Sequence, residues 1–371
     1  MLIGIDGNEA NVKNRVGSNI YSYELLQALY KLKVNIVVYL KDKPLNDLPK
    51  ITDWWQYRIV GPKRFWTQFG LPLDLYLHQP RPDVFFTPGH YLPRWCPCPA
   101  VMSILDVAYI YFPEMFKKRD LWQLRQWTGQ SVRKAKKILT ISQSSKNAII
   151  EHYTSRRRSV IKYYRVEPKK VVVTYPGLKM TKGRKKINLK KYGVEGDFLL
   201  YVGTLQPRKN LLRLIEAYSI LVSQYPDISL VIVGKKGWLY KEIFAKVKQL
   251  GLEKKVIFTG YVPNEELPAF YQKAQCFVLV SLYEGFGLPI LEAMHYGCPV
   301  VASNVSSLPE VVGQAGILVD PNKVEDIANG IREAIKNREK LIKKGYQQAK
   351  KFSWEKCAKE TLAVLEMVGR R

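Results

Sequence analysis

Short apolar runs alternate with longer amphipathic segments along nearly the whole chain. In the first half, the runs predict strands at residues 2–6, 35–40, 83–87, 100–104 and 137–142, with a helix at 19–30. The second half repeats the pattern, with strands at 198–203, 230–234, 256–260, 276–281, 300–303 and 317–320 and helices at 211–224 and 264–273. Near-continuous apolar strands separated by helices are typical of parallel sheets covered on both faces. The predicted fold class is α/β.

A polar break divides this pattern. After a predicted strand at 171–175, residues 176–186 contain turn formers and cations but no apolar periodicity, which indicates a linker. We expect an N-terminal Rossmann-like domain at 1–178 and a second Rossmann-like domain at 195–352. The last helix, at about 353–370, could pack back onto the first domain. Two such doubly wound domains would face each other across a cleft, and ligands would bind beyond the carboxyl ends of the strands.

The net charge points to an anionic partner. The 371 residues include 59 Lys and Arg against 32 Asp and Glu, a formal charge of +27. Residues 156–191 hold 14 cations and one acid, Glu167. Nucleic acid, anionic lipid, a phosphorylated substrate and a merely solvated hinge all fit this segment. Because it lacks regularly spaced aromatics and the chain has no nucleic-acid-reading motif, nucleic acid is not an expected partner.

The sequence also predicts a compartment. The apolar runs are far shorter than the roughly 20 residues that span a bilayer, and Asp6, Asn8 and Glu9 interrupt any secretory signal. Five scattered cysteines read as reduced thiols, and Cys96-Pro-Cys98 lacks the spacing of a zinc hairpin. We expect a cytoplasmic protein without a structural metal.

Candidate phosphate ligands follow the strand at 198–203. Gly203 and Thr204 begin a loop that carries Arg208 and Lys209. A planar guanidinium and a compact ammonium together suit a diphosphate. The alternative is a surface helix start with two solvated cations.

A second candidate anion site follows the strand at 276–281. Gly285 and Gly287 would permit close backbone approach, and Pro289 suits the first turn of a helix. Exposed amides at such a helix start can hold a phosphate. Glu284 and Glu292 could accept hydrogen bonds from sugar hydroxyls, or could be a capping acid and a surface acid.

These residues resemble a known family. The segment from Glu284 to Glu292, Glu-Gly-Phe-Gly-Leu-Pro-Ile-Leu-Glu, is similar to the acid pair of family 4 glycosyltransferases, which are retaining enzymes of the GT-B fold. Residues 201–210, 256–262, 299–303 and 308–311 also resemble that family, as do 64–73, 104–108 and 140–142 in the first half. The resemblance covers most of the chain, is more specific in the second domain, and is nearest to mannosyltransferase-like members.

The resemblance implies a role for each matching residue. Arg208 and Lys209 would bind the diphosphate of a nucleotide sugar, and Glu292 the ribose hydroxyls. Glu284 would face the donor sugar together with the amides of Gly285, Phe286, Gly287 and Leu288, while Gly203 and Thr204 would line the donor loop. The first domain would bind the acceptor, with Gly17 near the donor phosphates and Asp106 among the catalytic residues.

Three positions depart from the family pattern. Many relatives have two glycines where this chain has Val16-Gly17, and an Arg where it has Thr204. Many also place His before the Asp where this chain has Leu105-Asp106. Of the four histidines, His90 alone follows a predicted strand end that faces the cleft. It could compensate for the missing His at position 105, or it could be an exposed loop residue. The interpretation that the chain is an inactive member of the family also stays open.

The implied activity is transfer of a sugar, with mannose as the first guess, from a nucleotide-diphosphate donor to an acceptor hydroxyl with retention. We expect a role in cell-surface polysaccharide or glycolipid synthesis, a lipid-linked or saccharide acceptor, no metal, and no cofactor, since the nucleotide sugar is a substrate. Aromatics beside cations at 58–66 and 121–137 suggest peripheral attachment to an anionic membrane at the inner face of the cell membrane. The alternatives are a nucleotide-sugar epimerase or phosphorylase of the same fold, and a basic nucleic-acid-binding α/β protein.

Overall fold

The computed structural model describes residues 1–154, 166–178 and 187–370. The chain forms two compact units. Unit 1 comprises Met1–Gly177 and Phe352–Arg371, and unit 2 comprises Leu178–Lys351. Most of the predicted linker at 176–186, and half of the basic segment at 156–191, lie outside the described residues.

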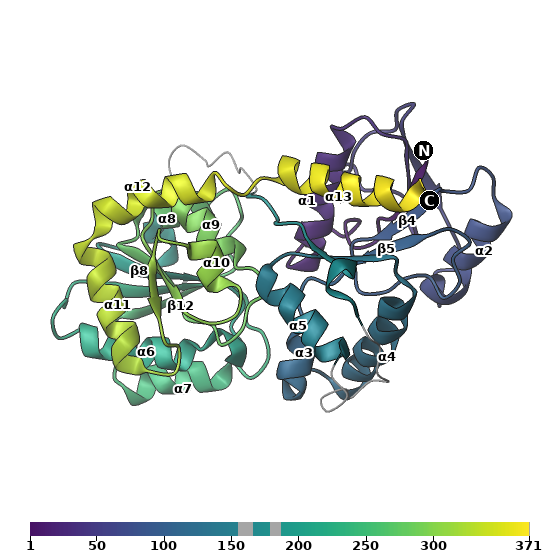
Figure 1. Cartoon of the computed structure of the whole chain (residues 1–371). Helices are drawn as coiled ribbons and strands as arrows, with labels where there is room; N and C mark the ends of the chain where they lie inside the picture. The colour runs from purple at the N-terminus through teal and green to yellow at the C-terminus, as the bar shows by residue number, and fades with distance from the viewer. Residues whose placement is uncertain (155–165, 179–186, 371) are drawn as a thin grey trace. The chain divides into compact units, whose positions relative to one another are not determined.

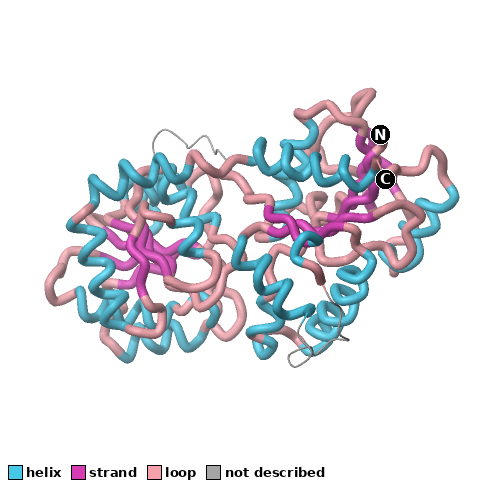
Figure 2. The backbone as a smooth tube through the Cα atoms, viewed as in Figure 1, coloured by secondary structure: helices cyan, strands magenta, loops and turns pink. Residues whose placement is uncertain are grey.

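Unit 1 is built on a parallel sheet of seven strands (Figure 2). In sheet order the strands are β3 (Trp55–Ile59), β2 (Ile36–Leu40), β1 (Ile3–Asp6), β4 (Val84–Thr87), β5 (Ala100–Ser103), β6 (Lys137–Thr140) and β7 (Val171–Val173). The helices of this unit include α1 (Ser18–Tyr30), α2 (Leu71–Leu77), α3 (Ala108–Tyr111), α4 (Lys118–Lys134) and α5 (Gln143–Thr154). A short π-helix, η1 (Trp66–Gly70), leads directly into α2.

Unit 2 contains a second parallel sheet, of six strands. Its order is β10 (Val256–Gly260), β9 (Ser229–Val233), β8 (Phe198–Val202), β11 (Cys276–Leu279), β12 (Val300–Ser303) and β13 (Ile317–Val319). The helices are α6 (Leu211–Leu221), α7 (Lys241–Gln249), α8 (Leu267–Lys273), α9 (Leu288–His295), α10 (Leu308–Val312), α11 (Val324–Lys336) and α12 (Arg338–Ala349). In Figure 1, these helices surround the strands of the unit.

The apolar runs are the strands. Every residue of β4, β5, β11 and β12 is buried, as expected for strands covered on both faces. The predicted α/β class with two Rossmann-like domains is therefore confirmed. The sequence pattern missed β3, an edge strand in which only Trp55 is buried, because half-exposed residues at a sheet edge leave no continuous apolar run.

The C-terminal helix, α13 (Trp354–Gly369), belongs to unit 1, where it packs against α1 and the central strands (Figure 1). Its buried residues recur at three- and four-residue spacing from Trp354 to Val368. The helix start approaches the chain after β7 so closely that a Cβ on Gly177 would lie 2.0 Å from the Trp354 nitrogen. Unit 1 is therefore completed by residues from both ends of the chain.

This packing predicts a large difference between two neighbouring residues of α13. Leu365 is fully buried, whereas the Met367 side chain is 49% exposed. Because Leu365→Ala leaves a cavity in the core of unit 1, we expect it to lower the free energy of unfolding by about 2–5 kcal/mol. Met367→Ala should change it by less than about 0.5 kcal/mol. Urea unfolding of both variants checks this, and equal small losses would contradict the packing of α13.

Candidate functional site

The two predicted phosphate loops lie side by side in unit 2. They follow β8 and β11, which are hydrogen-bonded neighbours at the centre of the sheet. From β8 the chain proceeds outward through β9 and β10, and from β11 it proceeds the other way through β12 and β13. The order of the strands thus reverses between β8 and β11, and ligands of open parallel sheets bind in the crevice at such a switch point.

Glu284 joins the two loops through both carboxylate oxygens. The Lys209 ammonium contacts Glu284 Oε1, and Arg208 Nη1 lies 3.4 Å from Oε2. Arg208 Nη1 also donates to the Tyr283 carbonyl. The exposed fractions of these three side chains are 17% for Arg208, 15% for Lys209 and 10% for Glu284. The trio is thus a largely desolvated cluster with an excess of one positive charge.

The charge of Glu284 is set by two opposed effects. Burial raises the pKa of its carboxyl, but the charges of Lys209 and Arg208 and the hydrogen bonds from Lys209 and Ser281 outweigh burial, so the pKa lies below its usual value. Glu284 therefore remains ionised at neutral pH, and its charge fixes both cations in place.

Asn210 and Ser281 support this cluster, although neither was predicted as a site residue. Asn210 adopts a left-handed conformation with φ of 58°, and its Nδ2 donates to the Val280 carbonyl at 3.0 Å and the Pro321 carbonyl at 2.7 Å. Ser281 Oγ donates to Glu284 Oε1 at 2.7 Å. The position of Asn210 directly after Arg208 and Lys209 could have signalled this role, since Asn tolerates positive φ.

Two serines that the sequence analysis also missed hold the start of α9. Ser307 Oγ lies 2.9 Å from the Glu284 carbonyl and 3.1 Å from that of Phe286, and the Glu284 amide donates to Ser306 Oγ at 3.0 Å. Gly287 has φ of 103°, and a Cβ there would meet Leu308 Cδ2 at 2.8 Å. Only glycine fits this position without strain, which explains why a glycine directly precedes α9.

Glu292 lies on α9 and is half-buried. Tyr271 OH, on α8, donates to its Oε2 at 2.8 Å. Of the other residues predicted in this unit, Thr204 is exposed and Leu288 is half-buried, while Gly285, Phe286 and Gly287 are buried. Gly203 continues the ladder from β8, with its amide donating to the Val233 carbonyl at 2.9 Å. The structure thus brings Arg208, Lys209 and Glu284 into direct contact and places the remaining predicted residues on the same two loops and on α9.

Gly17 and Asp106 lie in unit 1. Gly17 is exposed at the start of α1 with φ of 51°, and no atom would contact a Cβ there. Asp106 follows β5 and its Oδ1 accepts from the Ala108 amide at 2.9 Å. His90 is half-buried, so the expectation of an exposed loop histidine is wrong. It packs edge-on against the Tyr109 ring, with ring centres 6.2 Å apart.

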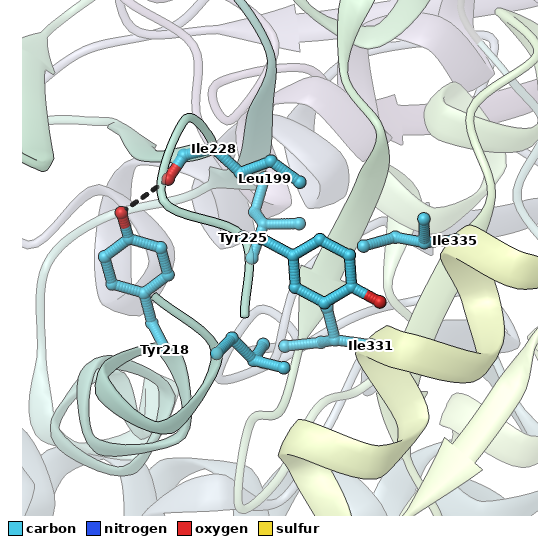
Figure 3. Close-up of a pocket in the computed structure, with 7 residues that line it drawn as sticks. Leu199, Tyr218, Tyr225, Ile228, Ile331 and Ile335 are labelled. Atoms are coloured by element: carbon cyan, nitrogen blue, oxygen red, sulfur yellow. Dashed lines mark hydrogen bonds between the residues drawn. The ribbon is translucent and has the colours of Figure 1, made fainter. Parts of the chain in front are cut away.

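A small pocket elsewhere in unit 2 has a different character (Figure 3). It is lined by apolar and aromatic side chains of α6, β8, α11 and the loop after α6, among them Tyr218, Tyr225, Ile331 and Ile335. The Tyr218 hydroxyl donates a hydrogen bond to the Ile228 carbonyl at 2.7 Å. Because a nucleotide needs several polar partners, this pocket is a packing defect of the core rather than a nucleotide site.

Within the ranges that the structure describes, no three His, Cys, Asp or Glu side chains cluster as metal ligands. No helix in the same ranges combines the length and apolarity that crossing a bilayer requires.

Comparison with known proteins identifies the family. The family described as glycosyl transferases group 1 matches residues 184–352. The O-antigen chain mannosyltransferase B of Escherichia coli is 34% identical over 321 residues, which cover 84% of this chain and 79% of that protein. The serotype-specific mannosyltransferase WbdA of Escherichia coli is 35% identical over 176 residues, which cover 45% of this chain and 21% of that protein.

Solved structures share the fold at low sequence identity. Sucrose-phosphate synthase from Thermosynechococcus elongatus has a TM-score of 0.74 at 18% identity, over 99% of this chain and 98% of that one. WaaG, a glycosyltransferase involved in lipopolysaccharide biosynthesis, has a TM-score of 0.70 at 16% identity, over 98% and 99%. Both are GT-B proteins. Since the similarity to the Escherichia coli mannosyltransferase extends over most of both sequences, the chain belongs to the group 1 glycosyltransferase family.

Proposed function

We propose that this glycosyltransferase moves a mannose-like sugar from a nucleotide-diphosphate donor to an acceptor hydroxyl with retention at the anomeric carbon. The observation that carries the donor site is the meeting of Arg208, Lys209 and the start of α9 at the switch point of the second sheet. The name of the Escherichia coli relative, a mannosyltransferase, supports mannose as the sugar.

Charge development during transfer explains why these groups are needed. As the bond between sugar and phosphate breaks, negative charge grows on the diphosphate. Arg208, Lys209 and the positive end of α9 would stabilise that charge without moving, because Glu284 already holds both cations. The departing phosphate oxygen could itself take the proton of the acceptor hydroxyl on the same face. Leu105 is therefore compatible with activity.

The remaining residues of the site would bind the donor. Glu292, which keeps a half-buried carboxylate on α9, would accept hydrogen bonds from the ribose hydroxyls. The backbone of Gly285 to Leu288 would contact the sugar and its phosphate, and Gly203 and Thr204 would flank the diphosphate. The acceptor, a saccharide or a lipid-linked sugar, would bind to unit 1. Of the two predicted residues in that unit, Asp106 would be a catalytic residue and Gly17 would bind the donor phosphates.

Removing either cation should strongly reduce turnover. Since loss of one preorganised donor costs about 100- to 1000-fold, we expect that drop in kcat for Arg208→Ala and for Lys209→Ala with GDP-mannose as donor. Acceptor-dependent release of GDP measures it. Lys248→Ala, which removes an exposed cation from α7, is the matched control and should retain kcat. Wild-type turnover of both site variants would disprove the assignment.

Transfer should not need a divalent metal, because two cations and a helix terminus already face the proposed diphosphate position. We expect acceptor-dependent GDP release to be the same in EDTA and in magnesium or manganese. Activity that EDTA abolishes and manganese restores would show that the phosphate site has been misassigned.

An exposed apolar row in unit 1 suggests contact with an anionic membrane. Phe65, Phe69, Leu73 and Leu77 recur every four residues through η1 and α2 and are 52–68% exposed. The Arg64 guanidinium lies 5.1 Å from the Phe65 ring centre, and Trp95, itself 49% exposed, packs against Phe69. Figure 1 shows α2 at an edge of unit 1. Aromatics beside cations suit the interface of a bilayer, where a lipid-linked acceptor would be found.

The membrane interface proposed from the structure differs in part from the one predicted at 58–66 and 121–137. Trp66 is 1% exposed and its Nε1 donates to the Val60 carbonyl at 3.0 Å, so it is a core residue. Trp127 packs edge-on against Tyr91, whereas Trp122 on α4 is 60% exposed. We assign the interface to the row from Phe65 to Leu77.

Vesicle co-sedimentation tests this surface. We expect binding to vesicles with anionic lipid, weakened by salt, and little binding to neutral vesicles, since each engaged cation contributes about 1 kcal/mol. The Phe69→Ser/Leu73→Ser double variant should lose most of the binding, and Trp122→Ser should keep it. An absence of wild-type binding to anionic vesicles at low salt would refute the membrane proposal.

A further inference from the structure

Two cysteines of unit 1 lie in direct contact. Cys96 and Cys98 flank Pro97 in the loop between β4 and β5, and their Sγ atoms are 3.6 Å apart. Both residues are half-buried, with one side packed against the core of the unit. The candidate donor site is in unit 2, so this pair of thiols is a separate reactive group.

The other three cysteines have a different environment. Cys276, Cys298 and Cys357 are buried. Burial raises the pKa of Cys298 and of Cys357 to about 12, and it raises that of Cys276 well above the usual value. These thiols therefore stay protonated at neutral pH and out of contact with reagents in solution. The five cysteines, which look alike in the sequence, divide into three inert ones and one accessible pair.

The two paired thiols lose their protons unequally. The hydrogen bond between them lowers the pKa of Cys96 and outweighs the opposing effect of burial, and the nearby Lys134 ammonium acts in the same direction as the hydrogen bond. The same hydrogen bond, together with burial, raises the pKa of Cys98. Cys96 is therefore the first of the two to become a thiolate, and Cys98 is the thiol that donates to it.

The loop that carries the pair is held on both sides. Before the pair, the Arg94 amide donates to the Thr67 carbonyl at 3.1 Å. After it, the Pro99 carbonyl accepts from the Phe85 amide at 2.9 Å. Pro97, between the two cysteines, has its φ fixed by its ring. The fold thus keeps the two sulfur atoms close to each other.

We propose that Cys96 and Cys98 form a reversible disulfide by exchange with a small disulfide such as oxidised glutathione. The Cys96 thiolate attacks one sulfur of the small disulfide, which gives a mixed disulfide and releases one small thiolate. Cys98 then loses its proton and attacks Cys96 Sγ, which releases the second small thiolate. The two protein thiols lose two electrons, the small disulfide gains them, and the two protons end on the two small thiols.

The geometry favours the second step. The two sulfur atoms must approach from 3.6 Å to about 2.05 Å, which is a short movement for two side chains that are already in contact. Disulfides that are exposed to solvent are typically the labile and regulatory ones. The state of the pair would therefore follow the ratio of thiol to disulfide around the chain. Because the pair lies outside the donor site, the proposal does not depend on the transferase function.

Equilibration of the whole chain in mixtures of reduced and oxidised glutathione tests the disulfide. Free thiols are trapped with N-ethylmaleimide, and mass spectrometry then reads the tryptic peptide 95–117, which contains no other cysteine. We expect this peptide to lose two hydrogens, with an equilibrium constant at least about tenfold larger in the folded chain than in concentrated urea, because the fold holds the thiols together. An equal constant in urea would overturn the proposal.

A serine variant separates the two steps. Cys98→Ser keeps a hydroxyl that can donate to Cys96 but removes the second sulfur, so we expect the reaction to stop with one glutathione bound at Cys96. The wild-type peptide should carry no glutathione once the reaction is complete. Glutathione that remains on the wild-type peptide, or none on Cys98→Ser, would contradict the proposed sequence of steps.

Limited alkylation identifies the attacking thiol. With iodoacetamide below one equivalent, we expect Cys96 to be labelled at least about tenfold more than Cys98, since the thiolate is the reactive form. Tandem mass spectrometry of the same peptide measures the ratio. Cys357, buried on α13, is the control within the chain and should be labelled only after unfolding. Equal labelling of Cys96 and Cys98 would refute the role of Cys96.

Discussion

Burial of the Glu284 carboxylate between Arg208 and Lys209 is the interaction on which the candidate donor site depends. It joins the loops after the two central strands of the second sheet, and it brings two cations together where their mutual repulsion would otherwise separate them. Asn210, Ser281 and Ser307 tie the same loops to their surroundings with hydrogen bonds. A site held in this way does not need to reorganise when negative charge develops on a leaving group.

The same parallel architecture occurs in both units. In each unit, the order of the strands reverses between two central strands, and ligands of open parallel sheets bind at such a point. Side chains decide what can bind there. Unit 2 provides Arg208, Lys209 and the start of α9 at this point, which favour a diphosphate.

Much of the fold could be predicted from the sequence because buried parallel strands require continuous apolar runs. The apolar runs at 198–203 and 276–281 predicted two strands, which the structure places at the centre of the second sheet, and the residues after them predicted Arg208, Lys209 and Glu284 as one site. The edge strand β3 escaped detection, because only Trp55 of its residues is buried. Ser306 and Ser307 escaped as well, since nothing in an ordinary serine pair shows that its hydroxyls will meet the loop at Glu284.

The sequence by itself determined the α/β class, the repeated unit and the two candidate phosphate loops, because strand burial and glycine-rich helix starts depend on local patterns. Only the tertiary structure decided that Glu284 neutralises one of the two cations, and that Trp66 is a core residue while Phe69 is exposed. These facts depend on which loops the sheets bring together. Lys209 and Glu284 are 75 positions apart in the chain, so their contact is a product of strand order and not of local sequence.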